Sequence, residues 1–158
     1  MASLTVWWFD SPGGAVGAGV RIDELAQEGA AHLVDAATIE WAEGQSKPRT
    51  THTRSRFAQG PRGKAFWRPV FDALLAPAGR DGDVPAPLEQ FGLDSEDFSH
   101  VRDRIAIGSS VLFLVSEPGN RDRIVEAFGG ASRYVELIYS NLPEHEEAQL
   151  RAAFTKRP

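Results

Sequence analysis

The sequence predicts an α+β fold: a ferredoxin-like βαββαβ sandwich with a helical and loop insertion between the second and third strands, and a C-terminal helix. Three observations predict it. A strand, a helix and a strand follow one another near the start of the chain, and the same order returns in the second half. Between the halves, over about residues 43–107, this regular order is interrupted. The last residues have the pattern of an amphipathic helix.

The first half begins with a short apolar segment. Residues 4–9 are apolar on both faces of an extended strand. Ser11 and Pro12 favour the start of a helix, and Gly29 favours its end. Residues 31–42 follow as the second strand, in which alternate side chains point to opposite faces.

The second half repeats this plan. Residues 109–117 form a strand that is again apolar on both faces, and Pro118 begins a helix. Residues 133–140 form the last strand, and Asn141 with Glu144 resembles a capping box at the start of the final helix. Alternation places three residues of the last strand on one face: Val135, Leu137 and Tyr139.

The interrupted middle has its own pattern. Residues 43–64 are polar and punctuated by glycine and proline, which predicts a long loop or an ordered arm. Residues 65–76 predict a short apolar helix that starts one residue before Pro69. A further helix is expected after a cap at Asp94 or Ser95.

The two central strands create a packing problem. In the ferredoxin-like plan, helices cover only one face of the sheet, yet both central strands are apolar on both faces. Either the apolar part of the insertion or a second subunit must cover the other face. We therefore expect self-association, as a homodimer or a larger assembly, unless the insertion fills this place.

Length and composition limit the class of protein. A chain of 158 residues suits one domain, residues 1–158. It has no cysteine, and its four histidines have no metal-binding spacing, so we expect neither a thiolate nor a metal site and no cofactor. No basic stretch followed by an apolar one opens the chain, so we expect a cytoplasmic protein with no transmembrane segment.

The charge is unevenly distributed. The net charge of −5 argues against general nucleic-acid binding. Yet residues 47–68, which we call the basic segment, contain seven basic residues and no acidic one. The rest of the chain carries 10 basic against 22 acidic residues, a net charge of −12. Within the basic segment, Arg54 and Arg56 are the candidate contacts for an anionic partner.

A glycine-rich run, residues 13–19, follows the first strand and enters the first helix. Gly14 and Gly19 have the spacing of a phosphate-binding loop, but Val20 and Arg21 stand where that motif needs lysine and serine or threonine. Close packing of the helix start against a neighbour is the better interpretation.

Six runs along the chain are similar in sequence and order to one known family. They include Leu4-Thr5-Val6-Trp7, the stretch from Asp35 to Thr50, Gly63-Lys64-Ala65-Phe66-Trp67, Phe91-Gly92-Leu93-Asp94, Gly108 to Leu114, and Asn141 to Phe154. In these runs the chain resembles the bacterial domain-of-unknown-function family 1269. The resemblance implies no reaction, and it implies a long apolar hairpin after Phe66-Trp67. This chain departs from the family there, because Arg68, Pro69 and Asp72 interrupt the apolar run.

Two sets of side chains are the candidates for a site. Asp35, His52 and Tyr134 are the catalytic candidates, since a carboxylate on an apolar strand face or a histidine beside arginines can serve as a general base. The alternatives are that Asp35 hydrogen-bonds a neighbouring loop from the strand edge and that His52 is a solvated loop histidine. The aromatic residues Trp8, Phe66, Trp67 and Phe71 would line an apolar ligand pocket beneath the insertion, or else pack in a core or a dimer interface.

These observations leave two functional hypotheses. The first is a self-associating, non-catalytic domain that binds a small-molecule or anionic partner near the basic segment. The second is a cofactor-free enzyme of specialised metabolism, of the cyclase or isomerase type, with an apolar pocket beside the sheet. Peripheral membrane contact through the basic segment and Phe66-Trp67 is a third hypothesis and ranks below both.

Overall fold

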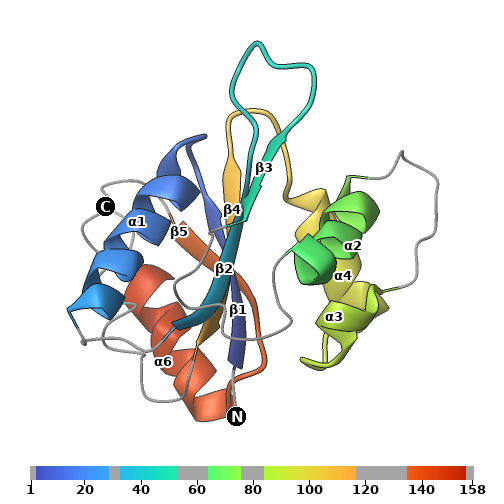
Figure 1. Cartoon of the computed structure of the whole chain (residues 1–158). Helices are drawn as coiled ribbons and strands as arrows, with labels where there is room; N and C mark the ends of the chain where they lie inside the picture. Colours follow the sequence, from blue (N-terminus) through green and yellow to red (C-terminus); the bar gives the residue numbers. More distant parts are fainter. Residues whose placement is uncertain (1–2, 29–32, 53–63, 76–83, 117–134, 156–158) are drawn as a thin grey trace.

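A computed structural model describes residues 3–28, 33–52, 64–75, 84–116 and 135–155. In these ranges the chain forms a five-stranded antiparallel sheet with helices on both faces (Figure 1). The strands are β1 (Ser3–Phe9), β2 (Leu33–Glu40), β3 (Arg49–His52), β4 (Ser110–Ser116) and β5 (Val135–Ser140). The helices are α1 (Gly14–Gln27), α2 (Lys64–Leu74), α3 (Ala86–Glu89), α4 (Ser95–Asp103) and α6 (Glu144–Thr155). The predicted α+β class is confirmed.

The strand order is β3-β2-β4-β1-β5, and every neighbouring pair is antiparallel. The two strands that are apolar on both faces, β1 and β4, lie inside the sheet. The sequence predicts a long loop or an ordered arm over residues 43–64, and the strand β3 forms within this segment. With this fifth strand the order differs from that of a four-stranded ferredoxin-like sheet. The connection between β4 and β5, residues 117–134, lies outside the described residues.

The edge strand β3 forms because its sequence suits a hairpin with β2. Thr50 is β-branched and pairs with Ile39, a partner of the same kind. Arg49 pairs with Glu40, and the Arg49 Nε atom lies 3.9 Å from a Glu40 carboxylate oxygen. The loop between the strands turns at Gly44, whose φ of 86° favours glycine. The polar sequence fits either a loop or an ordered arm, and pairing with β2 makes residues 49–52 a strand.

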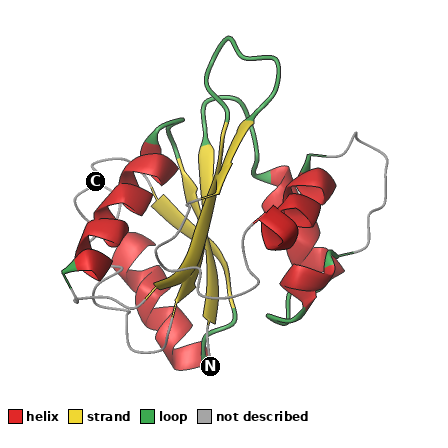
Figure 2. Cartoon of the chain, viewed as in Figure 1, coloured by secondary structure: helices red, strands yellow, loops and turns green. Residues whose placement is uncertain are grey.

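Alternation along the interior strands divides the buried residues into two cores, one on each face of the sheet. Helices lie on both of these faces (Figure 2). On one face, side chains of β1 and β4 pack with α1 and α6: Trp7, Phe9, Leu112 and Leu114 with Ala15, Ala18, Ile22 and Leu150. On the other face they pack with α2, α3 and α4: Leu4, Val6, Phe113 and Val115 with Trp67, Val70, Leu74, Leu88, Phe98 and Val101. We call the second group the insertion-side core.

The insertion-side core answers the packing problem raised by the sequence. Of the two alternatives, the insertion and a second subunit, the insertion covers the second face, through α2, α3 and α4 (Figure 1). Phe113 and Val6 are fully buried under this layer. The observation that led us to expect self-association is thus explained within one chain.

Helix α2 starts earlier than predicted and contains Pro69. A proline inside a helix removes one hydrogen bond and costs about 3 kcal/mol. Trp67, Val70 and Leu74 lie on the side of α2 that faces the sheet, and all three are buried. Burying each such side chain contributes about 1.5–3 kcal/mol, so packing outweighs the cost of the proline.

Helix α4 begins as the sequence predicts. Asp94 is its N-cap, and its carboxylate accepts a hydrogen bond of 2.8 Å from the Asp97 backbone N–H. The Asp97 carboxylate accepts a bond in return from the Asp94 N–H, at 3.3 Å. This reciprocal capping box fixes where the last helix of the insertion starts.

The predicted face of Tyr139 is wrong, because β5 carries a bulge. The register between β1 and β5 shifts between Val6 and Trp7, which pair with Tyr139 and Leu137. The extra residue, Ile138, breaks the alternation. Tyr139 therefore joins the insertion-side core, whereas Leu137 faces α1 and α6.

The glycines of α1 differ in what surrounds them. A Cβ atom on Gly14 would lie 2.6 Å from the Phe9 Cβ and 2.9 Å from the Ser11 Oγ. A Cβ on Gly17 would meet nothing within 4 Å. Close packing, the interpretation chosen from sequence, thus applies to Gly14 and not to Gly17.

These two glycines form a matched pair for mutation. We expect Gly14→Ala to destabilise the fold by roughly 1–3 kcal/mol, because the new methyl group overlaps backbone-anchored atoms. We expect Gly17→Ala to stabilise it by about 0.5–1 kcal/mol, because alanine is the better helix former in open space. Urea denaturation of both variants measures this. Equal effects of the two substitutions would contradict the packing described for Gly14.

Candidate functional site

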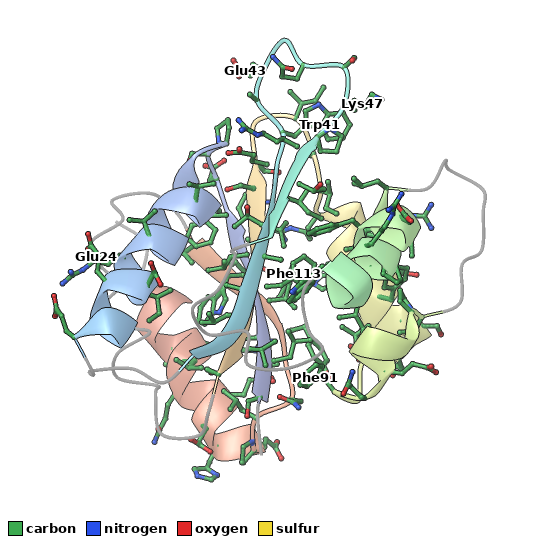
Figure 3. The ribbon with its side chains drawn as sticks, in the orientation of Figure 1. Glu24, Trp41, Glu43, Lys47, Phe91 and Phe113 are labelled. Carbon is green, nitrogen blue, oxygen red and sulfur yellow. The ribbon has the colours of Figure 1, made fainter. Side chains whose placement is uncertain are left out.

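Of the predicted aromatic set, Trp67 and Phe71 lie on α2 and pack into the insertion-side core. Trp67 is fully buried, with its ring centroid 5.7 Å from that of Phe113 and 6.2 Å from that of Phe71. Figure 3 shows Phe113 between the sheet and α2. Phe66 belongs to α2, and its side chain lies outside the described residues. A ligand would reach Trp67 only if α2 moved away from the sheet.

Trp8, the fourth aromatic candidate, lies in a half-buried cluster with Arg104 and Glu136 that joins the insertion to the sheet. We call it the cross-layer cluster. The Trp8 indole N–H donates a hydrogen bond of 3.0 Å to the Arg104 carbonyl, and the Arg104 guanidinium lies 4.2 Å from the centre of the Trp8 ring. The two terminal nitrogens of the Arg104 guanidinium donate to the two Glu136 carboxylate oxygens, at 2.9 and 3.3 Å.

The topology explains why these three residues meet. Trp8 and Glu136 are register partners on β1 and β5, so their side chains share one face. Arg104 is the C-cap residue of α4, whose end lies over that face. A planar guanidinium can stack on an indole and hold a carboxylate in a bidentate pair at the same time. The cluster is therefore suited to holding two layers together.

A second polar contact ties the insertion to the sheet. The Tyr139 hydroxyl donates a hydrogen bond of 2.7 Å to the Phe91 carbonyl, next to the turn at Gly92. Burial raises the pKa of Tyr139 to about 12, and the carboxylates of Asp97, Asp94 and Glu147 add to this shift. Burial is also the largest cause that raises the pKa of Asp97.

Backbone register brings two of the three catalytic candidates near each other. Asp35 pairs with Val115 of β4, and His52 pairs with Ala37 of β2. Asp35 and His52 are therefore diagonal neighbours on adjacent strands. Their side chains, and all of Tyr134, lie outside the described residues, so their catalytic roles stay predictions.

The cations of the basic segment whose side chains the structure describes are exposed. Lys47 and Arg68 are exposed, and the Arg49 side chain retains 80% of its accessible surface. Lys47 lies in the loop between β2 and β3, and Arg49 begins β3. Arg54 and Arg56, the two candidate anion contacts, lie outside the described residues.

The β2–β3 loop protrudes from one end of the sheet, as Figure 3 shows with Trp41, Glu43 and Lys47. The backbone anchors its base: the Trp41 N–H donates to the Ser109 carbonyl at 3.0 Å, and the Gly108 N–H donates to the Trp41 carbonyl at 2.7 Å. The Trp41 indole N–H donates to the Gln45 carbonyl at 3.0 Å. The base of the loop is thus held rigidly beside the start of β4.

Sequence reasoning did not select Arg104, Glu136, Phe91 or Tyr139 as contacts between layers. For Glu136 and Arg104, the sequence does contain a feature that indicates such a contact. Glu136 is a lone acid in an apolar strand, and Arg104 is a basic residue that directly follows an amphipathic helix. A charge in either place requires a partner, because unpaired charges are rarely buried. Nothing in the sequence indicates that the two residues are partners.

Residues 57–155 match the model of a family described as Protein of unknown function (DUF1269), and this is more than half of the chain. The chain belongs to this family. The match contains α2, α3, α4, β4, β5 and α6, while β1, α1, β2 and β3 precede it. The resemblance to DUF1269 expected from the sequence is confirmed over this range. No curated protein and no solved structure matches the chain.

DUF1269 membership carries no activity with it, so function has to be argued from the residues. The sequence departs from the family where an apolar hairpin is expected, and α2 with its buried face begins there. In the described part of the chain, no helix has both the length and the apolar character needed to cross a bilayer.

The cross-layer cluster gives the first prediction about this site. We expect Arg104→Gln to destabilise the protein by roughly 1–3 kcal/mol, because it removes the bidentate ion pair with the half-buried Glu136 carboxylate. Combining it with Glu136→Leu should recover part of this loss, with a coupling energy of about 1 kcal/mol. Urea denaturation, monitored by tryptophan fluorescence, measures the destabilisation and the coupling energy.

The exposed Arg21–Glu24 pair on α1 is the matched control, with 3.3 Å between its charged atoms. Arg21→Gln should cost less than about 0.5 kcal/mol, since water screens an exposed pair. Strictly additive losses from Arg104→Gln and Glu136→Leu would contradict the coupling.

The Tyr139 contact gives a pH-dependent prediction. The pKa is about 12 in the fold and ordinarily about 10, so the unfolded chain loses this proton first as the pH rises. The contribution of the Tyr139 phenol to the free energy of unfolding is fully present below pH 10 and is lost as the pH rises through 12. The loss amounts to about 2 kcal/mol, and Tyr139→Phe should abolish it. Urea denaturation of the parent protein and of Tyr139→Phe between pH 9 and 12 tests the loss and its absence in the variant.

Absorbance at 295 nm gives the pKa directly. The chain has two tyrosines, so a Tyr134→Phe background leaves Tyr139 as the only titrating phenol. A midpoint near 10 in that background would refute the buried hydrogen bond to Phe91.

Proposed function

We propose that this protein is a non-catalytic binding module that takes a small or short anionic partner at the basic segment, residues 47–68. The charge distribution carries the proposal: seven cations without one acid, on a body with a net charge of −12. The described cations of this segment, Lys47, Arg49 and Arg68, are exposed. Excess positive charge at the surface raises the local concentration of anions.

The size of the partner follows from the same charges. A long polyanion such as nucleic acid would extend beyond the basic segment and meet the acidic body, which repels it. A short anion would contact the cations alone. The existing ion pair between Arg49 and Glu40 offers little competition, because its atoms are 3.9 Å apart and Arg49 is mostly exposed.

The enzyme hypothesis receives less support. It requires an apolar cavity beside the sheet, lined by Trp8 or Trp67. Trp67 is fully buried against Phe113, and the Trp8 ring is covered by the Arg104 guanidinium. These residues contribute to packing between layers, so we propose binding in preference to catalysis.

Sheet-to-sheet self-association is not part of the proposal. Its basis was an apolar face without a cover, and α2, α3 and α4 cover that face. Membrane contact through Phe66-Trp67 loses half of its basis in the same way, because the Trp67 side chain has no exposed surface.

For the fold, we propose a ferredoxin-like plan with one added strand. The order β2-β4-β1-β5 is that of a split βαβ sheet, and β3 extends it at the β2 edge. What supports this is the interior position of β1 and β4 and the antiparallel pairing throughout. An experimental structure in which a helix joins β4 to β5 on the α1 side would establish it.

Titration with short-chain polyphosphate tests the binding function. We expect binding at low salt that weakens steeply as salt is added, because ions screen exposed charges. Arg54→Glu and Arg56→Glu should each weaken it roughly fivefold. Isothermal titration calorimetry at two salt concentrations measures the affinities.

Arg21→Glu is the matched control, since it changes the net charge equally but lies on α1. It should leave the affinity nearly unchanged. Equal weakening by Arg21→Glu and Arg54→Glu would show that only net charge matters and would refute a site at the basic segment.

A further inference from the structure

The two edge strands of the sheet differ in how far they are buried, and the exposed one could pair with a partner. In the strand order, β5 is one edge and β3 is the other. Every residue of β5 is buried except the half-buried Glu136. In β3, by contrast, Arg49 and Thr50 are exposed.

The β5 edge is also capped by a side chain. Arg151 of α6 donates a hydrogen bond to the Leu137 carbonyl of β5, and Glu147 holds the Arg151 guanidinium at 3.1 Å. An added strand would have to compete with the Arg151 guanidinium for this carbonyl. For β3, no comparable cap is found within the ranges that the structure describes.

An edge strand carries unpaired backbone N–H and C=O groups at alternate residues. In antiparallel pairing, alternate residues of β3 bond to β2 and the others direct these groups outward. An extended peptide can add to such an edge, and its main-chain hydrogen bonds then supply affinity.

Charge decides which peptide would add. A second copy of this chain would bring its own basic segment against the first, and like charges opposite each other are destabilising. An acidic peptide would instead place carboxylates near two exposed cations, Lys47 in the loop before β3 and Arg49 at the start of β3. Charge complementarity therefore favours an acidic partner over a second copy.

We infer that β3 is a docking edge for an acidic peptide in extended conformation, which would add to the sheet as a sixth strand. This rests on the proposed function and specifies its partner: the anion is a carboxylate-bearing chain that also pairs through its backbone. The short length of β3, four residues, limits the ladder to a few hydrogen bonds. Binding is therefore weak and depends on both charge and backbone pairing.

The test uses a fluorescein-labelled peptide of eight residues that alternates valine and glutamate. A second peptide has the same sequence and charge but carries N-methyl groups on its four central residues, which removes the donors of the ladder. We expect the first peptide to bind and the second to bind at least about tenfold more weakly, since two or more hydrogen bonds are lost. Fluorescence anisotropy measures both affinities.

A protein variant tests the same edge from the other side. Arg49→Glu should weaken binding of the first peptide roughly fivefold, and Arg21→Glu should not. A third peptide, with lysine in place of glutamate, should not bind.

The outcomes separate this inference from the proposed function. Equal binding of the plain and N-methylated peptides would overturn strand addition and leave anion binding intact. Binding of polyphosphate without binding of the acidic peptide would do the same. If neither polyphosphate nor the peptide binds, both the inference and the proposed function fail.

Discussion

The need to cover both faces of two interior strands shapes this protein. β1 and β4 present large apolar side chains in both directions, so water must be excluded from both sides of the sheet. Helices α1 and α6 cover one face, and the insertion folds back as α2, α3 and α4 to cover the other. The position of Trp67 against Phe113, the proline within α2 and the contacts of Arg104 and Tyr139 follow from that requirement.

With both faces of the sheet covered by helices, its two edge strands remain, and they differ in burial and in charge. One edge, β5, is buried and capped by Arg151. The other edge, β3, has Arg49 and Thr50 exposed and lies in the most basic part of the chain. Because Trp8, Trp67 and Phe71, three of the aromatic residues that suggested a pocket, are used in packing, we propose binding at the basic edge as the function.

Much of the fold could be predicted because local pattern and packing agree. The strands β1 and β4, the helix α1 after Ser11 and Pro12 and the cap of α4 at Asp94 all follow from periodicity or capping chemistry. Three features could not be predicted. β3 depends on pairing with β2, the face of Tyr139 depends on a bulge, and the helical state of Pro69 depends on burial beside Trp67. Each is decided by a partner distant in sequence.

The central claim is that the insertion is part of the core and not an appendage to it. Native-state amide hydrogen exchange tests this most directly, by comparing Val101 of α4 with Phe113 of β4. Both residues belong to the insertion-side core. We expect their amides to open with the same free energy, equal to that of global unfolding, since one cooperative unit exposes both. A much lower opening free energy at Val101, with Phe113 still protected, would contradict a shared core.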